Sequence, residues 1–359
     1  MNVKQIIHKG LSKLYRENPA EFIRDARNQF EDKYYSYGDL PEITDDELNQ
    51  YRKAWPMWDV QKRDLTWARV CKKAHGFSPY IIGNYHTWLL RQAFNPQAQL
   101  SSFENKAMCD IYFPEISFPE PYLRRINGLY YDAKMKSLSE KDAVNLLSSC
   151  GDYVIKPALD SMQGQGVEKI CLAKQKIPPF EAVWDSFQRQ KGDFICQEVL
   201  AQHPSIAAFN PTSLNTCRVT SIYINGKFGT ATCVKFGKKG AEVDNWRVSY
   251  FCGVDNQGRL TGEGFDNQLR RVTQSDNGLE LKGALLPDYE KMIQFVEKTH
   301  KHLFPNCGII GWDIVIDVDG NVRVIETNMT TVGIVIEQLA TGDFFRDFRD
   351  EICTILKKQ

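Results

Sequence analysis

Three absences narrow the classes to which this 359-residue chain can belong. No apolar run approaches the roughly 20 residues that a membrane-spanning helix requires, so no membrane span is expected. Basic and acidic residues number 45 each, so no excess of charge indicates nucleic acid or an anionic membrane surface. None of the 10 cysteines forms a C-x-x-C pair, and the N-terminus lacks the apolar core of a signal peptide. We expect a cytoplasmic protein without a zinc ribbon or a disulfide framework.

The first hundred residues favour helices. Apolar residues near the N-terminus recur at helical spacing, and Thr44 with Glu47 has the spacing of a capping box that begins a further helix. No catalytic pattern is visible here, and isolated histidines such as His75 and His86 are more typical of packed or solvated side chains. We expect residues 1–100 to form a mainly helical N-terminal lobe.

The residue pattern of the sequence changes at Asp152. Short β-rich runs separated by Gly, Asn and Asp now alternate with helical stretches such as residues 287–304. This alternation predicts an α+β fold. The expected strands comprise residues 153–156, 194–200, 217–224, 227–235, 313–318 and 321–328.

The most informative segment is an acidic hairpin that ends at Asn328. Asp319-Gly320 is a preferred dipeptide of a two-residue turn, which places Asp313 opposite Glu326, with Asn328 on the same face. Opposed carboxylates repel unless positive charge lies between them, and two carboxylates with an amide offer hard oxygen ligands for Mg²⁺ or Mn²⁺. The alternative is a pair of solvated acids at an exposed hairpin end, which the apolar residues on both faces disfavour.

A second hairpin is predicted to turn at Asn225-Gly226. The same arithmetic places Arg218 opposite Cys233, with Lys235 on the same face one step outward. Two cations so close together suggest an anionic partner, and phosphate suits both the guanidinium and the ammonium group. A polar sheet edge protected by lysine is an equally good interpretation.

Two weaker signals lie upstream of these hairpins. Lys156 ends a short strand and precedes the glycine-containing segment 161–166, whose backbone amides could wrap a phosphate. Taken alone, that segment is by default a surface turn, because it matches neither the P-loop nor the dinucleotide fingerprint. Gln197 and Glu198 are the polar pair of an apolar strand that could line an adenine pocket or belong to the core.

Taken in order, the lysine strand, the Gly-rich loop, the Gln-Glu pair, the arginine hairpin and the acidic hairpin resemble the ATP-grasp superfamily. More narrowly, they resemble its sugar-transfer-associated branch, from about Ser101 to Phe345. The resemblance implies an ATP-grasp fold in which two α+β subdomains hold ATP between them. It implies an ATP-grasp domain over 101–359, with a lid subdomain at about 136–198 and a metal-binding subdomain at about 199–350.

The resemblance also implies roles for individual residues. Asp313, Glu326 and Asn328 match the magnesium ligands of the family, in agreement with the cross-strand geometry above. Arg218 and Lys156 match catalytic positions, with Arg218 at the transferring phosphoryl group. Lys106 and Lys156 are expected to contact the phosphates or the adenine side of ATP. The full set expected to bind ATP consists of lysines, a mobile lid and an adenine hinge: Lys106, Lys156 and Lys235; Ser161, Gln163, Gly164, Gln165 and Gly166; Gln197, Glu198 and Val199.

The activity implied by the resemblance is that of an ATP- and Mg²⁺-dependent carboxylate–amine ligase, with Mn²⁺ as a substitute metal. ATP phosphorylates a substrate carboxylate, and an amine then attacks the acyl phosphate to give an amide and ADP. The expected partners are small-molecule carboxylates and amines, such as an amino acid and a sugar acid or glycan precursor of polysaccharide biosynthesis.

Two other functions are compatible with the same residues. One is a phosphotransferase that phosphorylates a small molecule and stops there, and the other is a nucleotide-binding module without turnover. The sequence also departs from the family near Asp244-Asn245, because Ser249-Tyr250 stands where relatives usually carry paired glycines. That departure concerns the acceptor pocket and leaves the ATP side unchanged.

Overall fold

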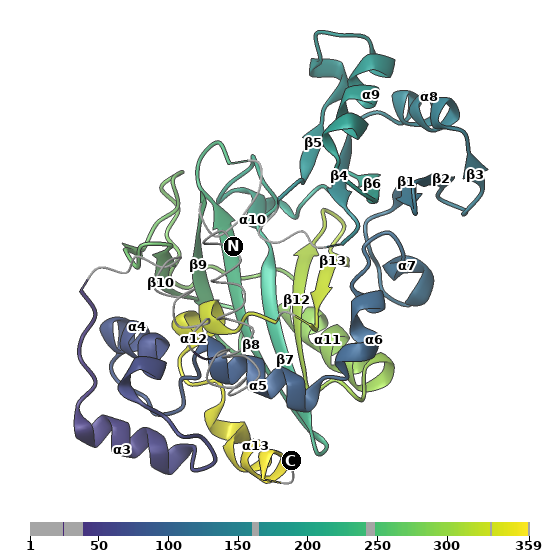
Figure 1. Cartoon of the computed structure of the whole chain (residues 1–359). Helices are drawn as coiled ribbons and strands as arrows, with labels where there is room; N and C mark the ends of the chain where they lie inside the picture. Colours follow the sequence, from purple (N-terminus) through teal and green to yellow (C-terminus); the bar gives the residue numbers. More distant parts are fainter. Residues whose placement is uncertain (1–23, 25–38, 160–164, 242–247, 331, 358–359) are drawn as a thin grey trace, which may run out of the picture.

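The computed structural model describes residues 24, 39–159, 165–241, 248–330 and 332–357. In these ranges the chain forms two antiparallel sheets, and helices pack against both of them (Figure 1). The α+β fold predicted from the sequence is therefore confirmed. None of the helices in the described part of the chain is long and apolar enough to cross a membrane.

The larger sheet has seven strands in the order β11-β10-β9-β8-β7-β12-β13. Both predicted hairpins belong to it, whereas β9, β10 and β11 were not predicted. Ser249 and Tyr250 begin β9, and both are buried, with Tyr250 packed in the apolar core. The strands are β7 (Cys217–Ile224), β8 (Lys227–Gly237), β9 (Ser249–Val254), β10 (Leu260–Asp266), β11 (Arg271–Val272), β12 (Ile309–Ile316) and β13 (Val322–Asn328).

The hairpin of β7 and β8 forms as the sequence predicts. Asn225 and Gly226 have φ values of 51° and 81°, so both central residues of the turn are left-handed, as a tight hairpin turn of this kind requires. Arg218 pairs with Cys233 in the resulting register. The predicted register is therefore confirmed.

The turn of the acidic hairpin is longer than the two residues predicted at Asp319-Gly320. The amide of Asp317 donates to the carbonyl of Asn321 at 3.0 Å, so residues 318–320 form the turn. The Asp317 carboxylate also accepts hydrogen bonds from the amides of Asp319 and Asn321, at 3.0 and 2.8 Å. Aspartate side chains that bond to the backbone two residues on stabilise such turns, and this one favours the longer connection.

The two strands nevertheless pair Asp313 with Glu326. The register shifts between this pair and the next one, Ile314 with Val324, so Ile325 is an extra residue on β13. Such a residue is a β-bulge. The longer turn displaces the register by one residue and the bulge restores it. The predicted pairing of the two acids is confirmed, although the two-residue turn that led to it is wrong.

The smaller sheet has six strands in the order β3-β2-β1-β6-β4-β5. Helices α8 (Glu140–Cys150) and α9 (Pro179–Arg189) pack against it, with Leu147, Val183 and Phe187 in its core. The sheet begins before residue 136, because β1 pairs with the predicted strand β6 and β2 pairs with β1. The strands are β1 (Pro121–Ile126), β2 (Leu129–Asp132), β3 (Ser137–Leu138), β4 (Tyr153–Pro157), β5 (Glu168–Ile170) and β6 (Phe194–Glu198).

The described part of the N-terminal hundred residues is helical and packs on the larger sheet. Trp67 and Leu90 share one apolar cluster with Phe251 of β9 and with the C-terminal helices, so these helices have no separate core. The capping box of Thr44 and Glu47 is present. The helices are α3 (Asp45–Ala54), α4 (Thr66–His75), α5 (Asn84–Phe94), α6 (Gln97–Phe103), α7 (Cys109–Tyr112), α10 (Pro204–Ala207), α11 (Tyr289–Leu303), α12 (Val335–Thr341) and α13 (Arg349–Leu356), with 3-10 turns η1 (Lys62–Leu65), η2 (Leu172–Lys174) and η4 (Arg346–Phe348).

Candidate active site

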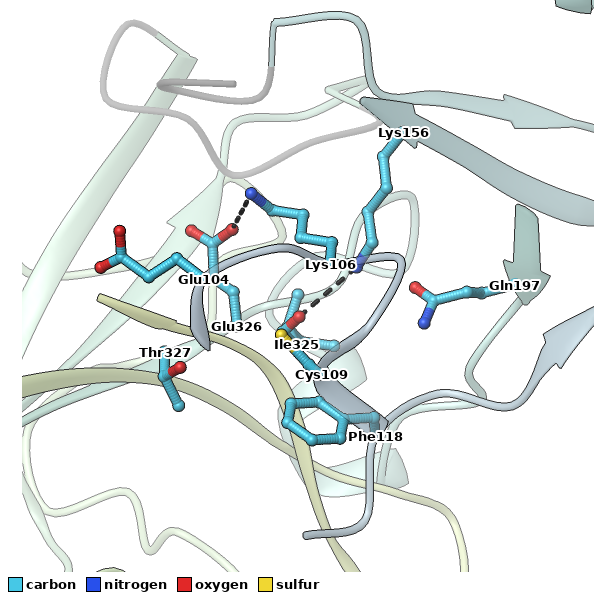
Figure 2. Close-up of a pocket in the computed structure, with 9 residues that line it drawn as sticks. All are labelled: Glu104, Lys106, Cys109, Phe118, Lys156, Gln197, Ile325, Glu326 and Thr327. Carbon is cyan, nitrogen blue, oxygen red and sulfur yellow. Dashed lines mark hydrogen bonds and ion pairs between the residues drawn. The ribbon is translucent and has the colours of Figure 1, made fainter. Parts of the chain in front are cut away.

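A small pocket lies where the two sheets and the α6–α7 segment meet (Figure 2). Strands β4 and β6 of the smaller sheet each contribute one side chain, and the bulged part of β13 contributes three residues. The pocket is lined by Glu104, Lys106, Cys109, Phe118, Lys156, Gln197, Ile325, Glu326 and Thr327. Three residues expected to bind ATP and one expected metal ligand are thus brought together.

Two lysines reach β13 from different elements of this pocket. Nζ of Lys156, on β4, donates to the carbonyl oxygen of Ile325 at 3.4 Å, and Nζ of Lys106 lies 3.3 Å from a carboxylate oxygen of Glu326 (Figure 2). Burial lowers the pKa of Lys156 to about 8, and the neighbouring charge of Lys106 acts in the same direction. The lining carries the carboxylates of Glu104 and Glu326 beside these two lysines, and the ammonium groups are donors that suit the oxygens of a polyphosphate.

Arg218 and Lys235 converge, as their predicted register requires, but their anionic partner in the structure is Asp313. The guanidinium donates from Nε and Nη2 to the two carboxylate oxygens at 2.8 and 2.7 Å, and Lys235 Nζ donates at 3.0 Å. Pairing of β7 with β12 places Arg218 directly beside Asp313. Although burial opposes it, the two cations hold the pKa of Asp313 well below its ordinary range, so the carboxylate stays ionised.

Basic side chains balance the negative charges of the two acids, Asp313 and Glu326. The positive charge expected to offset the repulsion between Asp313 and Glu326 comes from the chain itself, since Arg218 and Lys235 balance the first carboxylate and Lys106 balances the second. The stability of the hairpin therefore does not by itself require a metal.

The three residues proposed to hold Mg²⁺ nevertheless lie at one end of the hairpin. Asp313 pairs with Glu326, and Asn328, two pairs further along, donates to the Asp313 carboxylate at 3.3 Å. Within the described residues no group of three or more His, Cys, Asp or Glu side chains could hold a metal. The donor set of two carboxylates and one amide fits Mg²⁺, which accepts oxygen ligands and keeps several waters.

The expected adenine hinge is only partly directed at the pocket. Gln197 is buried, lines the pocket and donates to the carbonyl of Pro119 at 3.0 Å. The carboxylate of Glu198 pairs instead with Arg323 of β13 and accepts from the amide of Glu120 at 2.9 Å. Glu198 therefore links the two sheets through its side chain. Val199 follows β6, half-buried and outside the set of pocket-lining residues.

The expected lid residues Ser161, Gln163 and Gly164 lie outside the described residues, and Gln165 directly follows them. Gly166 is described and has a φ of 75°, in the left-handed region that favours glycine. A Cβ at this position would lie 2.7 Å from Cγ of Pro157, at the end of β4. The close approach ties the end of the glycine segment to the strand that carries Lys156.

A family model described as sugar-transfer associated ATP-grasp matches residues 87–353 of this chain. The chain belongs to this family. The match includes every described residue of the candidate site and begins inside α5, so the ATP-grasp region extends into the helical N-terminal segment. A comparison with curated proteins finds no match.

Several solved structures are similar to this ATP-grasp protein at low identity. D-alanyl-alanine synthetase A from Vibrio cholerae shares 13% identity with a TM-score of 0.42, over 73% of this chain and 66% of that one. The VanG D-Ala:D-Ser ligase from Enterococcus faecalis shares 10% with a TM-score of 0.42, over 73% and 62%. The L-amino acid ligase from Bacillus licheniformis shares 12% with a TM-score of 0.38, over 69% and 47%. The match thus spans less than two thirds of the length of each of these proteins.

The ATP-grasp site contains residues that the sequence analysis missed. Glu104 lines the pocket and accepts from the amide of Thr330 at 2.7 Å, which holds the loop after β13. Asn95 is buried and donates to the carbonyls of Ile309 and Met329, both at 2.8 Å, so it joins β12 to the same loop. The position of Glu104 just before Lys106 could have identified it as a site residue, whereas no sequence pattern marks Asn95.

Cys109 is the thiol of the pocket lining. Burial raises its pKa to about 12, so the thiol is protonated at neutral pH. A protonated thiol is a poor nucleophile. The pKa of Cys109 therefore disfavours nucleophilic catalysis by this residue.

Proposed function

We propose that the chain is an ATP- and Mg²⁺-dependent ligase that joins a carboxylate to an amine and forms ADP. The observation that carries the proposal is the pairing of Asp313 with Glu326, with Arg218 and Lys235 on one carboxylate and Lys106 on the other. Membership of the ATP-grasp family supports nucleotide binding at this position. Oxygen ligands and cations side by side are what a metal–polyphosphate complex needs.

Each residue of the candidate site has a proposed role in binding or orienting ATP and the metal ion. Lys106 and Lys156 bind phosphate oxygens, and Arg218 offsets the charge of the transferring phosphoryl group. Mg²⁺, held by Asp313, Glu326 and Asn328, would supply charge neutralisation at the phosphate oxygens. Lys156 is buried and Arg218 half-buried, which strengthens their interactions because little water screens them.

The proposed reaction needs no covalent protein intermediate. A carboxylate oxygen of the substrate attacks the γ-phosphorus of ATP, the bond to ADP breaks, and an acyl phosphate results. The amine nitrogen then attacks the acyl carbon, phosphate leaves, and the nitrogen loses a proton to give the amide. The protonated thiol of Cys109 agrees with this scheme, since it forms no competing acyl-enzyme.

The substrate class is part of the proposal. The family description associates these ATP-grasp proteins with sugar transfer, which supports a sugar acid or glycan precursor as one substrate and an amino acid or other amine as the second. A role in polysaccharide biosynthesis is part of the same proposal and is supported by the family description alone.

A screen of carboxylate and amine pairs tests the proposal. Amino acids, sugar acids and amino sugars are combined with ATP and Mg²⁺, ADP release is measured, and the product mass is determined. We expect ADP together with a product heavier by the amine minus water, and neither in the Glu326→Gln variant. A stable phosphorylated product would establish a phosphotransferase, and ATP binding without turnover for any pair would establish a binding module.

A further inference from the structure

Glu337 is a buried carboxylate that the proposed chemistry does not use. It lies on α12, its exposure is 1%, and its neighbours Val335, Leu339 and Ala340 belong to an apolar cluster. A buried carboxylate costs free energy unless it is hydrogen-bonded and paired with a cation. The carboxylate of Glu337 therefore needs specific hydrogen-bonding and charged partners in this apolar setting.

Two side chains of β7 supply those partners. The hydroxyl of Thr220 donates to Oε1 of Glu337 at 2.7 Å, and Nη1 of Arg218 lies 3.9 Å from the same oxygen. Arg218 and Thr220 are two residues apart on a strand, so their side chains share one face of the sheet. That face is the one on which Glu337 lies.

The guanidinium of Arg218 is thus held on two sides. Its Nε and Nη2 donate to Asp313, and its Nη1 forms an ion pair with Oε1 of Glu337 at 3.9 Å. The planar fork of arginine has few orientations that satisfy two carboxylates at once.

Close packing of α12 fixes the position of Glu337. A Cβ on Gly253 of β9 would lie 2.3 Å from the carbonyl oxygen of Ala340, so the helix backbone contacts the strand backbone. Leu339 packs in the same apolar cluster as Cys233 of β8 and Phe251 of β9. A helix held this tightly cannot move its carboxylate without repacking the sheet.

We propose that Glu337 is a positioning residue for Arg218, and that Thr220 in turn orients Glu337. The inference rests on the proposed function, because only there does Arg218 contact the transferring phosphoryl group. Glu337 acts through the arginine and touches neither nucleotide nor substrate. Burial raises the pKa of Glu337, whereas the charge of Arg218 and the hydrogen bond from Thr220 oppose that shift.

The first test is kinetic and uses Glu337→Gln, which keeps the size of the side chain and an oxygen for Thr220. We expect kcat for ADP release to fall about 10- to 100-fold, as for other displaced catalytic groups, with KM for ATP within about twofold of the wild-type value. Thr220→Val, which removes only the hydroxyl, should lower kcat in the same direction by less.

Glu351→Gln is the matched control. It removes a carboxylate that pairs with Lys227 at 3.1 Å, outside the candidate site, and should leave both kinetic constants unchanged. A wild-type kcat in Glu337→Gln overturns the proposal, whether or not the melting temperature falls.

The second test does not depend on turnover. In protein labelled with nitrogen-15 on arginine, the Nε–H signal of Arg218 is assigned by its loss in Arg218→Lys, and its exchange with solvent is measured. We expect slow exchange in the wild type and in Glu351→Gln, and exchange at least about tenfold faster in Glu337→Gln, because the guanidinium gains freedom. Equal exchange in all three proteins overturns the positioning role. If the wild type turns over no substrate, the proposed function fails and this measurement still decides the role of Glu337.

Discussion

Lys156 donates a hydrogen bond to the backbone carbonyl of Ile325, the residue that forms the bulge in β13. A bulge residue stands outside the regular ladder of the sheet. One irregularity therefore does two things. It returns Asp313 and Glu326 to a direct pairing, and it presents a carbonyl to a lysine of the other sheet.

We predict that nucleotide binding weakens as the pH rises through about 8. The pKa of Lys156 is lowered from 10.5 to about 8, so its ammonium group loses its proton in that range and no longer attracts phosphate. The Kd for ATP, measured by calorimetry from pH 7 to pH 9.5, should increase about tenfold, the effect of losing one charged hydrogen bond.

Lys156→Arg is the matched control, because arginine stays charged over the whole range. Its Kd for ATP should be nearly independent of pH. The same lysine makes the free energy of unfolding rise between about pH 8 and 10.5, since the unfolded chain binds its proton more tightly there. Parallel pH profiles for the two proteins would show that another group is responsible.

We predict that the two acids of the hairpin respond differently to loss of charge. Asp313→Asn leaves the half-buried Arg218 and Lys235 without their shared, buried carboxylate, which should cost about 3 kcal/mol of stability. The side chain of Glu326 is 29% exposed, so Glu326→Gln should keep a melting temperature near that of the wild type.

Both variants should lose Mg²⁺-dependent turnover, because each removes a proposed oxygen ligand. Thermal denaturation and ADP release, measured on the same preparations, separate the two effects. Full turnover in Glu326→Gln, with an unchanged dependence on Mg²⁺ concentration, would remove that residue from the ligand set.

We predict that the protein loses stability in mild acid through His300. Its Nε2–H donates to the carbonyl of Cys307 and its Nδ1 lies 2.7 Å from the hydroxyl of Ser221, which also accepts from Trp312 Nε1. Burial lowers the pKa of His300 from 6.5 to about 4.

His300 therefore binds a proton in the unfolded chain but stays neutral in the folded chain over this pH range. The free energy of unfolding falls as the pH drops from about 6.5 towards 4. The expected loss is up to about 3 kcal/mol, from 1.36 kcal/mol per pKa unit, measured by urea denaturation at several pH values. His300→Gln should show a smaller dependence on pH over this interval, and an equal dependence would assign the effect to other groups.

We predict that Gly253→Ala destabilises the protein and disturbs Arg218. The added Cβ would lie 2.3 Å from the carbonyl oxygen of Ala340, so α12 must shift away from β9. Overpacking of this kind costs about 1–3 kcal/mol. Gly192→Ala is the control, since a Cβ there meets nothing within 4 Å. Equal melting temperatures in the two variants would contradict the tight contact.

Much of the local architecture could be predicted because it depends on neighbouring residues. Asn225 and Gly226 accept positive φ at low cost, so the β7–β8 turn and its register follow from the dipeptide. The length of the acidic turn was predicted wrongly, because the side chain of Asp317 competes for the backbone amides. The bulge at Ile325 restores the pairing of Asp313 with Glu326. The alternation of residues along a strand does not predict such a bulge.

The sequence by itself determined which residues carry charge and oxygen atoms in the two hairpins, because turn chemistry and strand alternation act over a few residues. Only the tertiary structure decided which charges balance one another. Arg218 and Asp313 are separated by 95 positions and meet because β7 pairs with β12. Glu337 lies in a short apolar helix, and its partnership with Arg218 exists only once that helix packs on the sheet. Burial and ion pairing of this kind depend on the approach of distant segments, which no local pattern records.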